Sequence, residues 1–590
     1  MNRPVSLFRA SGLLQVSGLA LLLNLSGLFW GLPARFHPDE KADVVLAMAR
    51  ERRLAPDSFI NPSLPLYAML PAVGLQDRLA QRGLLRGLAT DPLVAGRALS
   101  ALAGAAAVFV LGLAVRRHAP SLGLLPPLLL ALSPGAVNLC HFATPEAWLL
   151  LGTTVTLGLA LDHADARASV LALGLALGLT ASTKYTAAAL LAPALLAAWL
   201  RPRGEARPRD RLVLGIAGFL LLTTGLVLLG DPGAALGARL HLKDARLLHP
   251  EHALGFVRSL GRALALGGAL VLSLTALACV RAAGVLHRVA SRLGRAEIVG
   301  LLLAAATGFV LGTPFAAARP IAFLSDLAFN AQTRLEYKGL RGEATSFLPY
   351  ASLLGDALTL PVLVAALIGL LLALTRAHRS RKPLILALAL LAPYLLVASS
   401  GHRAMRFIAV AWPAAAWLAA AVLVAIKDRR ARLVALGGVL ARTAAAALLV
   451  TRLFFVDSRI LAARYLEANV PPGATVDLIA NDPGYAPTIP QGRTLRLVPT
   501  LSREMAPVPR FVDAARQYPG EASPWLVLTA SFYERFLDHS DQQPERAAFF
   551  RDLLEGRGGF GVAARFRQEG FWRPSANEFL DPEIVVLRKR

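Results

Sequence analysis

Residues 93–115 read LVAGRALSALAGAAAVFVLGLAV, a run of 23 residues with one charged side chain, Arg97. A helix needs about 20 mostly apolar residues to cross the hydrocarbon core of a bilayer, so this stretch is predicted to span a membrane. The whole chain has the same character, because 55% of its 590 residues are hydrophobic and only 17% are charged. An ordinary soluble protein carries about 25% charged residues. The composition therefore predicts a polytopic α-helical membrane protein.

Twelve further segments pass the same length test, which gives about thirteen predicted transmembrane helices. They lie near residues 11–32, 93–115, 119–137, 146–162, 167–183, 185–200, 212–230, 254–280, 297–314, 351–374, 383–399, 407–426 and 433–456. The last is the least regular, because Arg442 lies in its middle, where a charge is costly unless it faces protein or reaches the interface.

The net charge of +24 would suggest a nucleic-acid partner in a soluble protein, but here the basic residues cluster between the apolar segments. With the N-terminus in the cytoplasm, the cytoplasmic connections contain 22 Lys and Arg residues. The short connections on the other face contain three, which are Lys184, Arg403 and Arg406. The positive-inside rule thus predicts a multi-pass cell-membrane protein with a cytoplasmic N-terminus and no nucleic-acid partner.

Three connections on the outer face are long, at about 33–92, 231–253 and 315–350. The first contains two amphipathic segments, 37–53 and 64–85, which are predicted to be helices at the membrane surface. After residue 455 the Leu/Ala runs give way to EANVPPGATVDLIANDPGY, the pattern of a helix, a turn and a short strand. We therefore expect a transmembrane domain over 1–455 and a soluble α/β domain over 456–590 on the outer face.

Carboxylates gather on the predicted outer face. The first outer loop begins RFHPDEKADVVLAMA, with Asp39 and Glu40, and the second connection, HFATPEAW, places Glu146 at the start of a span. Each acid also suits a helix start, where free N–H groups favour negative charge. Carboxylates that converge in a partly dry cleft can act as a general base or bind a divalent cation. Asp39 and Glu146 are the candidate metal ligands, and metal use stays open.

Cations lie on the same face. Lys184 occupies the tight connection TASTKYTAAA, Arg403 and Arg406 are three apart in SSGHRAMRFIAVAWP, and Arg334 and Lys338 lie in QTRLEYKGL. The spacing of three predicts that Arg403 and Arg406 share a helical face. Together these side chains can bind an anionic group such as a lipid phosphate. Snorkelling to the interface is the alternative for Lys184.

Other chemistries find no sequence support. His37, His141 and His402 lie in outer segments, but no H-x-x-x-H or Cys/His spacing predicts a zinc site. The chain also lacks a Walker loop, a G-x-G-x-x-G after a strand and a G-x-S-x-G elbow. No nucleotide cofactor is therefore expected.

The order of these motifs resembles a known family. HPDE after the first span, NPSLPLY, GRALSALAGAAAVFVLGLAVRR, HFATPEAW, TKYT and HRAMRFIAVAWP are similar, in that order, to bacterial GT-C glycosyltransferases. Among these enzymes the chain resembles the protein O-mannosyltransferases and aminoarabinose transferases, of the kind grouped as glycosyltransferase families 39 and 83. The resemblance covers about residues 1–455, and ARYLEANVPPGATV looks like the start of the C-terminal domain of many bacterial members.

The resemblance implies an inverting transferase that moves a sugar from a polyprenyl-phosphate donor to an acceptor at the outer face. It assigns Asp39, with Glu40 beside it, to the catalytic or acceptor-orienting acid of the first loop. Glu146 matches a position that is usually aspartate, and its longer side chain is a departure from the family. Lys184, Arg403 and Arg406 match basic positions that face the donor phosphate. The acceptor can be a protein, a lipid or a glycan, and the sugar is not specified.

Three alternatives remain open at this point. Many spans with few intramembrane charges also suit a lipid or sugar transporter or flippase, although no inverted hydropathy repeat is found. A polysaccharide polymerase or ligase would share the lipid-linked donor. A non-catalytic scaffold that binds through its outer domain is the third alternative.

Overall fold

The structure is a computed structural model that describes residues 10–201, 208–243, 248–279, 296–333, 336–337, 340–341, 346–376, 381–480, 482–503, 506–570 and 574–590. Helices dominate the first three quarters of the chain. They are α1 (Ala10–Leu25), α2 (Ala42–Arg50), α3 (Leu64–Gln81), α4 (Pro92–His118), α5 (Leu125–Ala131), α6 (Pro134–Cys140), α7 (Glu146–Ala164), α8 (Val170–Ala181), α9 (Leu191–Leu200), α10 (Pro208–Leu229), α11 (Asp231–Lys243), α12 (Pro250–Cys279), α14 (Ala296–Gly312), α15 (Phe315–Ala318), α16 (Pro320–Gln332), α17 (Phe347–Leu358), α18 (Leu360–Thr375), α19 (Pro383–Ala398), α20 (Trp412–Ala425) and α21 (Arg429–Val456).

The helical part has the composition of a multi-pass membrane protein. Among the described residues, five helices are long and apolar enough to cross a bilayer, and the bent pair α17–α18 adds a sixth. Six shorter apolar helices, of 10–17 residues, accompany them. The polytopic helical fold is therefore confirmed, whereas the number of thirteen spans stays a prediction. The amphipathic segments of the first outer loop form α2 and α3.

Two predicted spans are not continuous helices. The predicted segment 119–137 is divided into α5 and α6, because Pro134 at the start of α6 lacks the N–H that an uninterrupted helix needs. The predicted segment 351–374 is bent by 116° between α17 and α18, at Thr359, whose φ is +76°. The last predicted span is continuous over α21, and Arg442 in its middle lines a cavity of about 540 Å³ that also borders Asp356.

The C-terminal part forms a small α/β unit. Its helices are α22 (Ser458–Asn469), α23 (Val508–Glu521), α24 (Ala530–Asp538) and α25 (Pro544–Leu554), and its strands are β3 (Thr475–Ile479), β4 (Thr494–Leu497), β5 (Trp525–Thr529), β6 (Phe560–Phe566) and β7 (Ile584–Lys589). The sheet order is β4-β3-β5-β7-β6, with β3, β4 and β5 parallel and β7 antiparallel to both neighbours. A separate two-stranded pair, β1 (Glu336–Tyr337) and β2 (Leu340–Arg341), is antiparallel.

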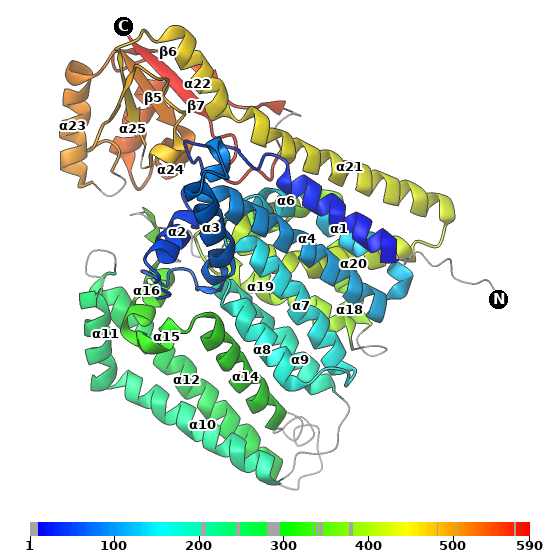
Figure 1. Cartoon of the computed structure of the whole chain (residues 1–590). Coiled ribbons are helices and arrows are strands. Elements are labelled where there is room, and N and C mark those ends of the chain that lie inside the picture. The colour runs from blue at the N-terminus through cyan, green and yellow to red at the C-terminus, as the bar shows by residue number, and fades with distance from the viewer. Residues whose placement is uncertain are drawn as a thin grey trace.

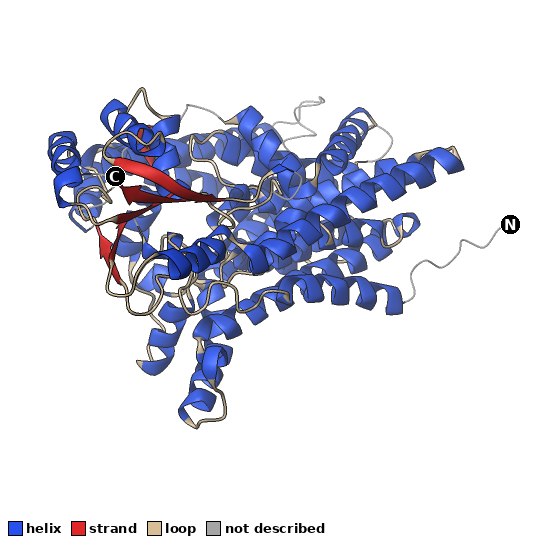
Figure 2. Ribbon diagram, turned by 90° about the horizontal axis from the view of Figure 1, so that it is seen from above, coloured by secondary structure: helices blue, strands red, loops and turns tan. Residues whose placement is uncertain are grey.

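Both faces of this sheet are covered, because alternate residues of a strand point to opposite sides. Leu526 and Leu528 of β5 join the aromatic cluster of α23, α24 and α25, whereas Val527 packs with α22. Figure 1 shows this unit at one end of the helical part, above α2 and α3, with α21 extending from it along the helices. Figure 2 shows the same sheet, in red, at one end of the helical part. The first outer loop therefore lies next to the C-terminal unit.

Candidate active site

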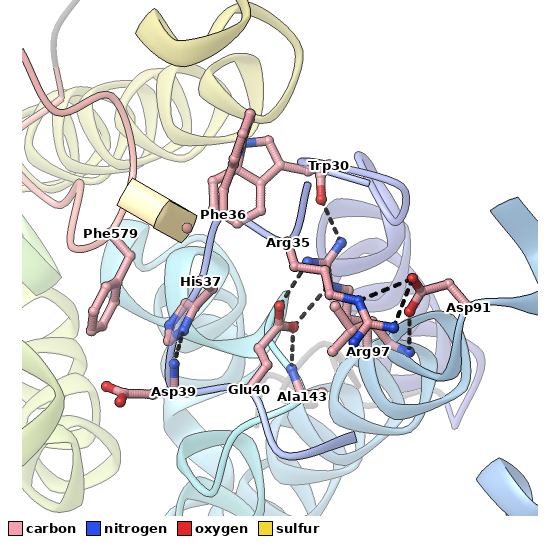
Figure 3. Close-up of polar contacts among 12 residues, drawn as sticks. Trp30, Arg35, Phe36, His37, Asp39, Glu40, Asp91, Arg97, Ala143 and Phe579 are labelled. Atoms are coloured by element: carbon pink, nitrogen blue, oxygen red, sulfur yellow. Dashed lines mark hydrogen bonds and ion pairs between the residues drawn. The ribbon is translucent and has the colours of Figure 1, made fainter. Parts of the chain in front are cut away.

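The turn after α1 is built around His37, whose ring lies between two phenylalanines. Its centroid is 3.9 Å from that of Phe579 and 4.3 Å from that of Phe142. The backbone N–H of Asp39 donates to Nδ1 of His37 at 3.1 Å. Burial and the nearby guanidinium of Arg406 hold the pKa of His37 well below its usual range. His37 is therefore a neutral acceptor that fixes the direction of the chain at Asp39 (Figure 3).

Glu40 turns away from Asp39 and enters a buried ion pair. Arg97 of α4 donates from Nε to Oε1 at 2.8 Å and from Nη2 to Oε2 at 2.7 Å, and the backbone N–H of Ala143 also donates to Oε1, at 2.8 Å. The Glu40 side chain is 1% exposed. Arg97 in addition donates to the carbonyl of Trp30 (Figure 3). Glu40 thus ties the first outer loop to α4 and has no oxygen left without a donor.

Asp39 has a different environment. Its side chain is 49% exposed, and its carboxylate Oδ2 lies 3.5 Å from Nη2 of Arg406. Figure 3 shows the Asp39 carboxylate directed away from the Glu40–Arg97 pair. A half-exposed carboxylate with one long contact to a cation can accept a proton from an incoming group.

Arg406 is the centre of a small charged cluster. Its Nη1 donates to Oε1 of Glu578 at 2.7 Å, and its backbone N–H donates to Oε2 of the same residue at 3.0 Å. Its guanidinium carbon also lies 4.7 Å from the ring centroid of Phe579 and 5.4 Å from that of Phe407. Residues from the first outer loop, the 400–407 connection and the C-terminal unit therefore meet at one guanidinium.

The predicted acid Glu146 and the predicted cation Lys184 form a second pair beside this cluster. Lys184 Nζ donates to Glu146 Oε1, and their side chains are 9% and 4% exposed. Lys184 Nζ also lies 5.1 Å from the ring centroid of Phe407, the ring that Arg406 contacts. Lys184 is buried in an ion pair, so its side chain does not extend to the surface as snorkelling would require.

A cavity of about 130 Å³ opens next to this pair. Lys184, Tyr185, Tyr350, His402 and Phe407 contribute to its walls, together with Ile60 and Asn61 of the first outer loop. The lining is mostly apolar but includes the Lys184 ammonium, a cation that can bind an anionic group.

Arg403 and Arg406 do not share a helical face, so that prediction is wrong. Ala404 between them is extended, with φ −154° and ψ 138°, and only residues Met405–Phe407 form a 3₁₀ turn. The side chain of Arg403 consequently has a different partner from that of Arg406, and its Nε donates to Ser346 Oγ at 3.0 Å. The other two predicted cations, Arg334 and Lys338, lie outside the described residues.

The carboxylates are poorly arranged for a metal ion. The two candidate ligands, Asp39 and Glu146, are each paired with a basic side chain. Within the described ranges, no group of three or more His, Cys, Asp or Glu residues could hold a metal. Divalent cations such as Mg²⁺ and Ca²⁺ bind several oxygen ligands at once. As placed here, these residues do not fit such an ion, and the reaction proposed for this site does not depend on one.

Sequence reasoning missed three residues that complete the site. Arg97 carries a signal that could have identified it, because a lone charge within a predicted span needs a partner. Glu578 and Phe579 carry none, since they come from the C-terminal unit and belong to no motif. Arg459 of α22 fixes their segment, because its guanidinium is fully buried and donates to the carbonyls of Phe36 and Phe579, at 2.8 Å each.

Residues 83–228 match the family of dolichyl-phosphate-mannose-protein mannosyltransferases. The matched part includes Glu146 and Lys184. This match confirms the resemblance to mannosyltransferases that the sequence motifs indicated. No curated protein sequence matches the chain.

Solved structures of three enzymes are similar to this chain. ArnT from Cupriavidus metallidurans bound to undecaprenyl phosphate is 14% identical, with a TM-score of 0.43 over 98% of both chains. The Archaeoglobus fulgidus oligosaccharyltransferase in the apo form is 12% identical, with a TM-score of 0.49 over 92% of this chain and 73% of that one. The arabinofuranosyltransferase AftD from Mycobacteria is 16% identical, with a TM-score of 0.32 over 100% of this chain and 40% of that one.

Proposed function

We propose that this chain is a membrane glycosyltransferase that moves a sugar from a polyprenyl-phosphate donor to an acceptor hydroxyl at the outer face. The observation that carries the proposal is the meeting of the half-exposed Asp39 carboxylate with the Arg406 guanidinium, beside the buried Lys184–Glu146 pair. A base and cations are the groups that such a transfer needs. The mannosyltransferase match over 83–228 supports the same class of reaction.

Asp39 acts as the general base. The acceptor hydroxyl attacks the anomeric carbon of the donor sugar while its proton passes to a carboxylate oxygen of Asp39. The new bond joins the acceptor oxygen to the sugar, and the bond between the sugar and the phosphate oxygen breaks. Attack from the side opposite the phosphate inverts the anomeric configuration. The exposure of Asp39 leaves room for the acceptor.

Arg406 and Lys184 stabilise the leaving group. As the sugar–phosphate bond breaks, negative charge increases on the lipid phosphate, and cations already held in place stabilise that charge without reorganisation. Both side chains contact the ring of Phe407, which keeps them in one region. The cavity beside Lys184 is the proposed phosphate pocket.

Glu146 and Glu40 are proposed as positioning residues. Glu146 holds Lys184 in place through a buried ion pair. Glu40 holds the first outer loop against α4 through Arg97, and so fixes the backbone that carries Asp39. We assign the catalytic domain to residues 1–455 and the outer-face domain to 456–590, with the N-terminus in the cytoplasm.

The test uses the full chain in liposomes with radiolabelled polyprenyl-phosphate sugars and an envelope extract as the acceptor source. A transferase releases free polyprenyl phosphate and labels the extract, and NMR of the product reports inversion of the anomeric centre. Protein-free liposomes are the control. Movement of intact labelled donor across the bilayer without bond cleavage would instead establish a transporter.

A further inference from the structure

The connection between β6 and β7 leaves the C-terminal unit and enters the helical part. We call residues 574–581 the inserted segment. Asn138 of α6 donates from Nδ2 to the carbonyl of Ala576 at 2.9 Å, and both side chains are buried. Ala576 and Leu580 belong to the same apolar core as the membrane helices. The inserted segment is therefore held between helices that are far from it in sequence.

Glu578 is the charged residue that this segment brings to the site. Its two carboxylate oxygens accept from Arg406, one from the guanidinium at 2.7 Å and one from the backbone N–H at 3.0 Å. The side chain is 17% exposed. Its neighbour Phe579 lies against both His37 and Arg406, which places Glu578 next to the proposed base, Asp39.

The backbone around Glu578 is held in an unusual conformation. Phe579 has φ +66° and Asp581 has φ +49°, values that residues other than glycine seldom adopt. Such a conformation is strained and persists only where the surroundings enforce it. Here the carbonyl of Phe579 accepts from Arg459, and the Asp581 carboxylate accepts the backbone N–H groups of Ser458 and Gln568.

A carboxylate and a phosphate make the same demand on a guanidinium, because both present two oxygens to its N–H groups. In this structure Glu578 takes one of the donors of Arg406, and Asp39 lies near another. A lipid phosphate that binds the Nη1 donor of Arg406 therefore has to displace a carboxylate that the chain itself supplies.

We infer that Glu578 is an internal competitor of the donor phosphate for Arg406. This inference rests on the proposed function, because it assumes that Arg406 binds the phosphate of a polyprenyl donor. With no donor bound, Glu578 keeps the guanidinium charge paired and directed into the site. When the phosphate arrives, it takes the Nη1 donor and Glu578 withdraws. Glu578 thereby sets how tightly the lipid phosphate, as donor or as released product, is held.

The test measures the affinity of undecaprenyl phosphate for the full chain in nanodiscs by calorimetry. Glu578→Gln removes the competing charge and is expected to bind about fivefold more tightly, the change expected for loss of about 1 kcal/mol of competition. Glu569→Gln is the matched control, because Glu569 is an exposed residue of the same connection that loses the same charge. This control is expected to bind as the wild type does.

The outcomes test separately whether the chain binds the donor phosphate and whether Glu578 competes with that phosphate for Arg406. If the wild type binds and Glu578→Gln binds equally or more weakly, Glu578 only orients Arg406 and the competition is wrong while the donor assignment stands. If neither protein binds, both the donor assignment and the competition are wrong. Should Glu578→Gln fail to fold, Glu578→Asp keeps the charge on a shorter side chain and is expected to raise the affinity by less.

Discussion

Two adjacent acids of the first outer loop belong to regions with opposite properties. Glu40 lies in a closed region, where Arg97 and a backbone N–H satisfy its two oxygens and exclude solvent. Asp39 lies in an open region, where the contact to Arg406 is long and half of the side chain is exposed. The closed region makes the loop rigid, and the rigid loop presents the open carboxylate. Glu40 is therefore a structural residue, and Asp39 is available for chemistry.

The largest expected effect comes from Asp39→Asn in the open region. The substitution keeps size but removes the base, so turnover is expected to fall about 10²–10⁴-fold. The melting temperature is expected to stay unchanged, because the ion pair of the Asp39 carboxylate with Arg406 is long and half-exposed. Single-turnover transfer with purified protein measures the loss of turnover, and a thermal melt measures the melting temperature. Asp43→Asn, at an exposed acid of α2, is the matched control and should retain activity.

Arg97→Met tests the closed region. It leaves Glu40 charged, buried and without its partner, which costs about 3–5 kcal/mol of unfolding free energy. Chemical unfolding in detergent measures this loss. The double variant Glu40→Leu with Arg97→Met removes both charges and is expected to regain most of the stability. A single variant as stable as the wild type would show that the pair does not hold the loop.

Arg406→Gln should separate donor binding from turnover. Removing a charge-assisted contact of about 1.5–3 kcal/mol lowers kcat by about 10–100-fold, because the contact strengthens as the phosphate gains charge. The Michaelis constant for the donor is expected to change less than kcat. Arg403→Gln is the comparison, since Arg403 binds Ser346 instead, and its loss should be clearly smaller. Equal losses at both positions would return Arg403 to the phosphate site.

Local composition could predict most of the helices but not how they are interrupted. The apolar length of α4 and α7 was enough to identify both as spans. The break between α5 and α6 follows from a proline inside an apolar run, and the bend at Thr359 depends on a positive φ that only packing can enforce. A hydropathy average over about 20 residues is hardly changed by one proline or one positive φ. It therefore detects a membrane span but not the residue at which the helix breaks.

The site could be predicted only in part, because its contacts join distant residues. Glu146 and Lys184 were both expected at the outer face, and the structure pairs them. The separate roles of Asp39 and Glu40 depend on Arg97, which is 57 residues from Glu40. Glu578 is 172 residues from Arg406, and no local pattern connects them.

The pH dependence of the unfolding free energy tests whether buried His37, next to Asp39, is neutral in the folded protein. Its folded-state pKa lies well below the unfolded value of about 6.5, so the unfolded state binds a proton first as the pH falls. His37 therefore contributes fully to the free energy of unfolding above pH 6.5. This contribution decreases as the pH falls below 6.5, by up to about 2 kcal/mol at pH 5. Melts of the wild type and His37→Gln between pH 7 and 5 measure the difference. Identical slopes would mean that folding does not lower the pKa of His37.

The smallest expected effect is that of Lys184→Arg, which keeps the charge and changes only its shape. Lys184 lies in a buried pair with Glu146 and against Phe407, and a planar guanidinium cannot place its charge as the compact ammonium does. The misplaced charge is expected to lower kcat/KM about fivefold to tenfold, which corresponds to about 1–1.4 kcal/mol. Lys41→Arg, at a lysine of the first outer loop that makes no ion pair with Glu146, is the control and should be neutral. Because 55 of the 62 basic residues are arginine, a lysine at 184 points to a requirement for a compact charge. An unaltered Lys184→Arg enzyme, with the same donor affinity, would remove Lys184 from the phosphate site and leave Arg406 as its principal cation.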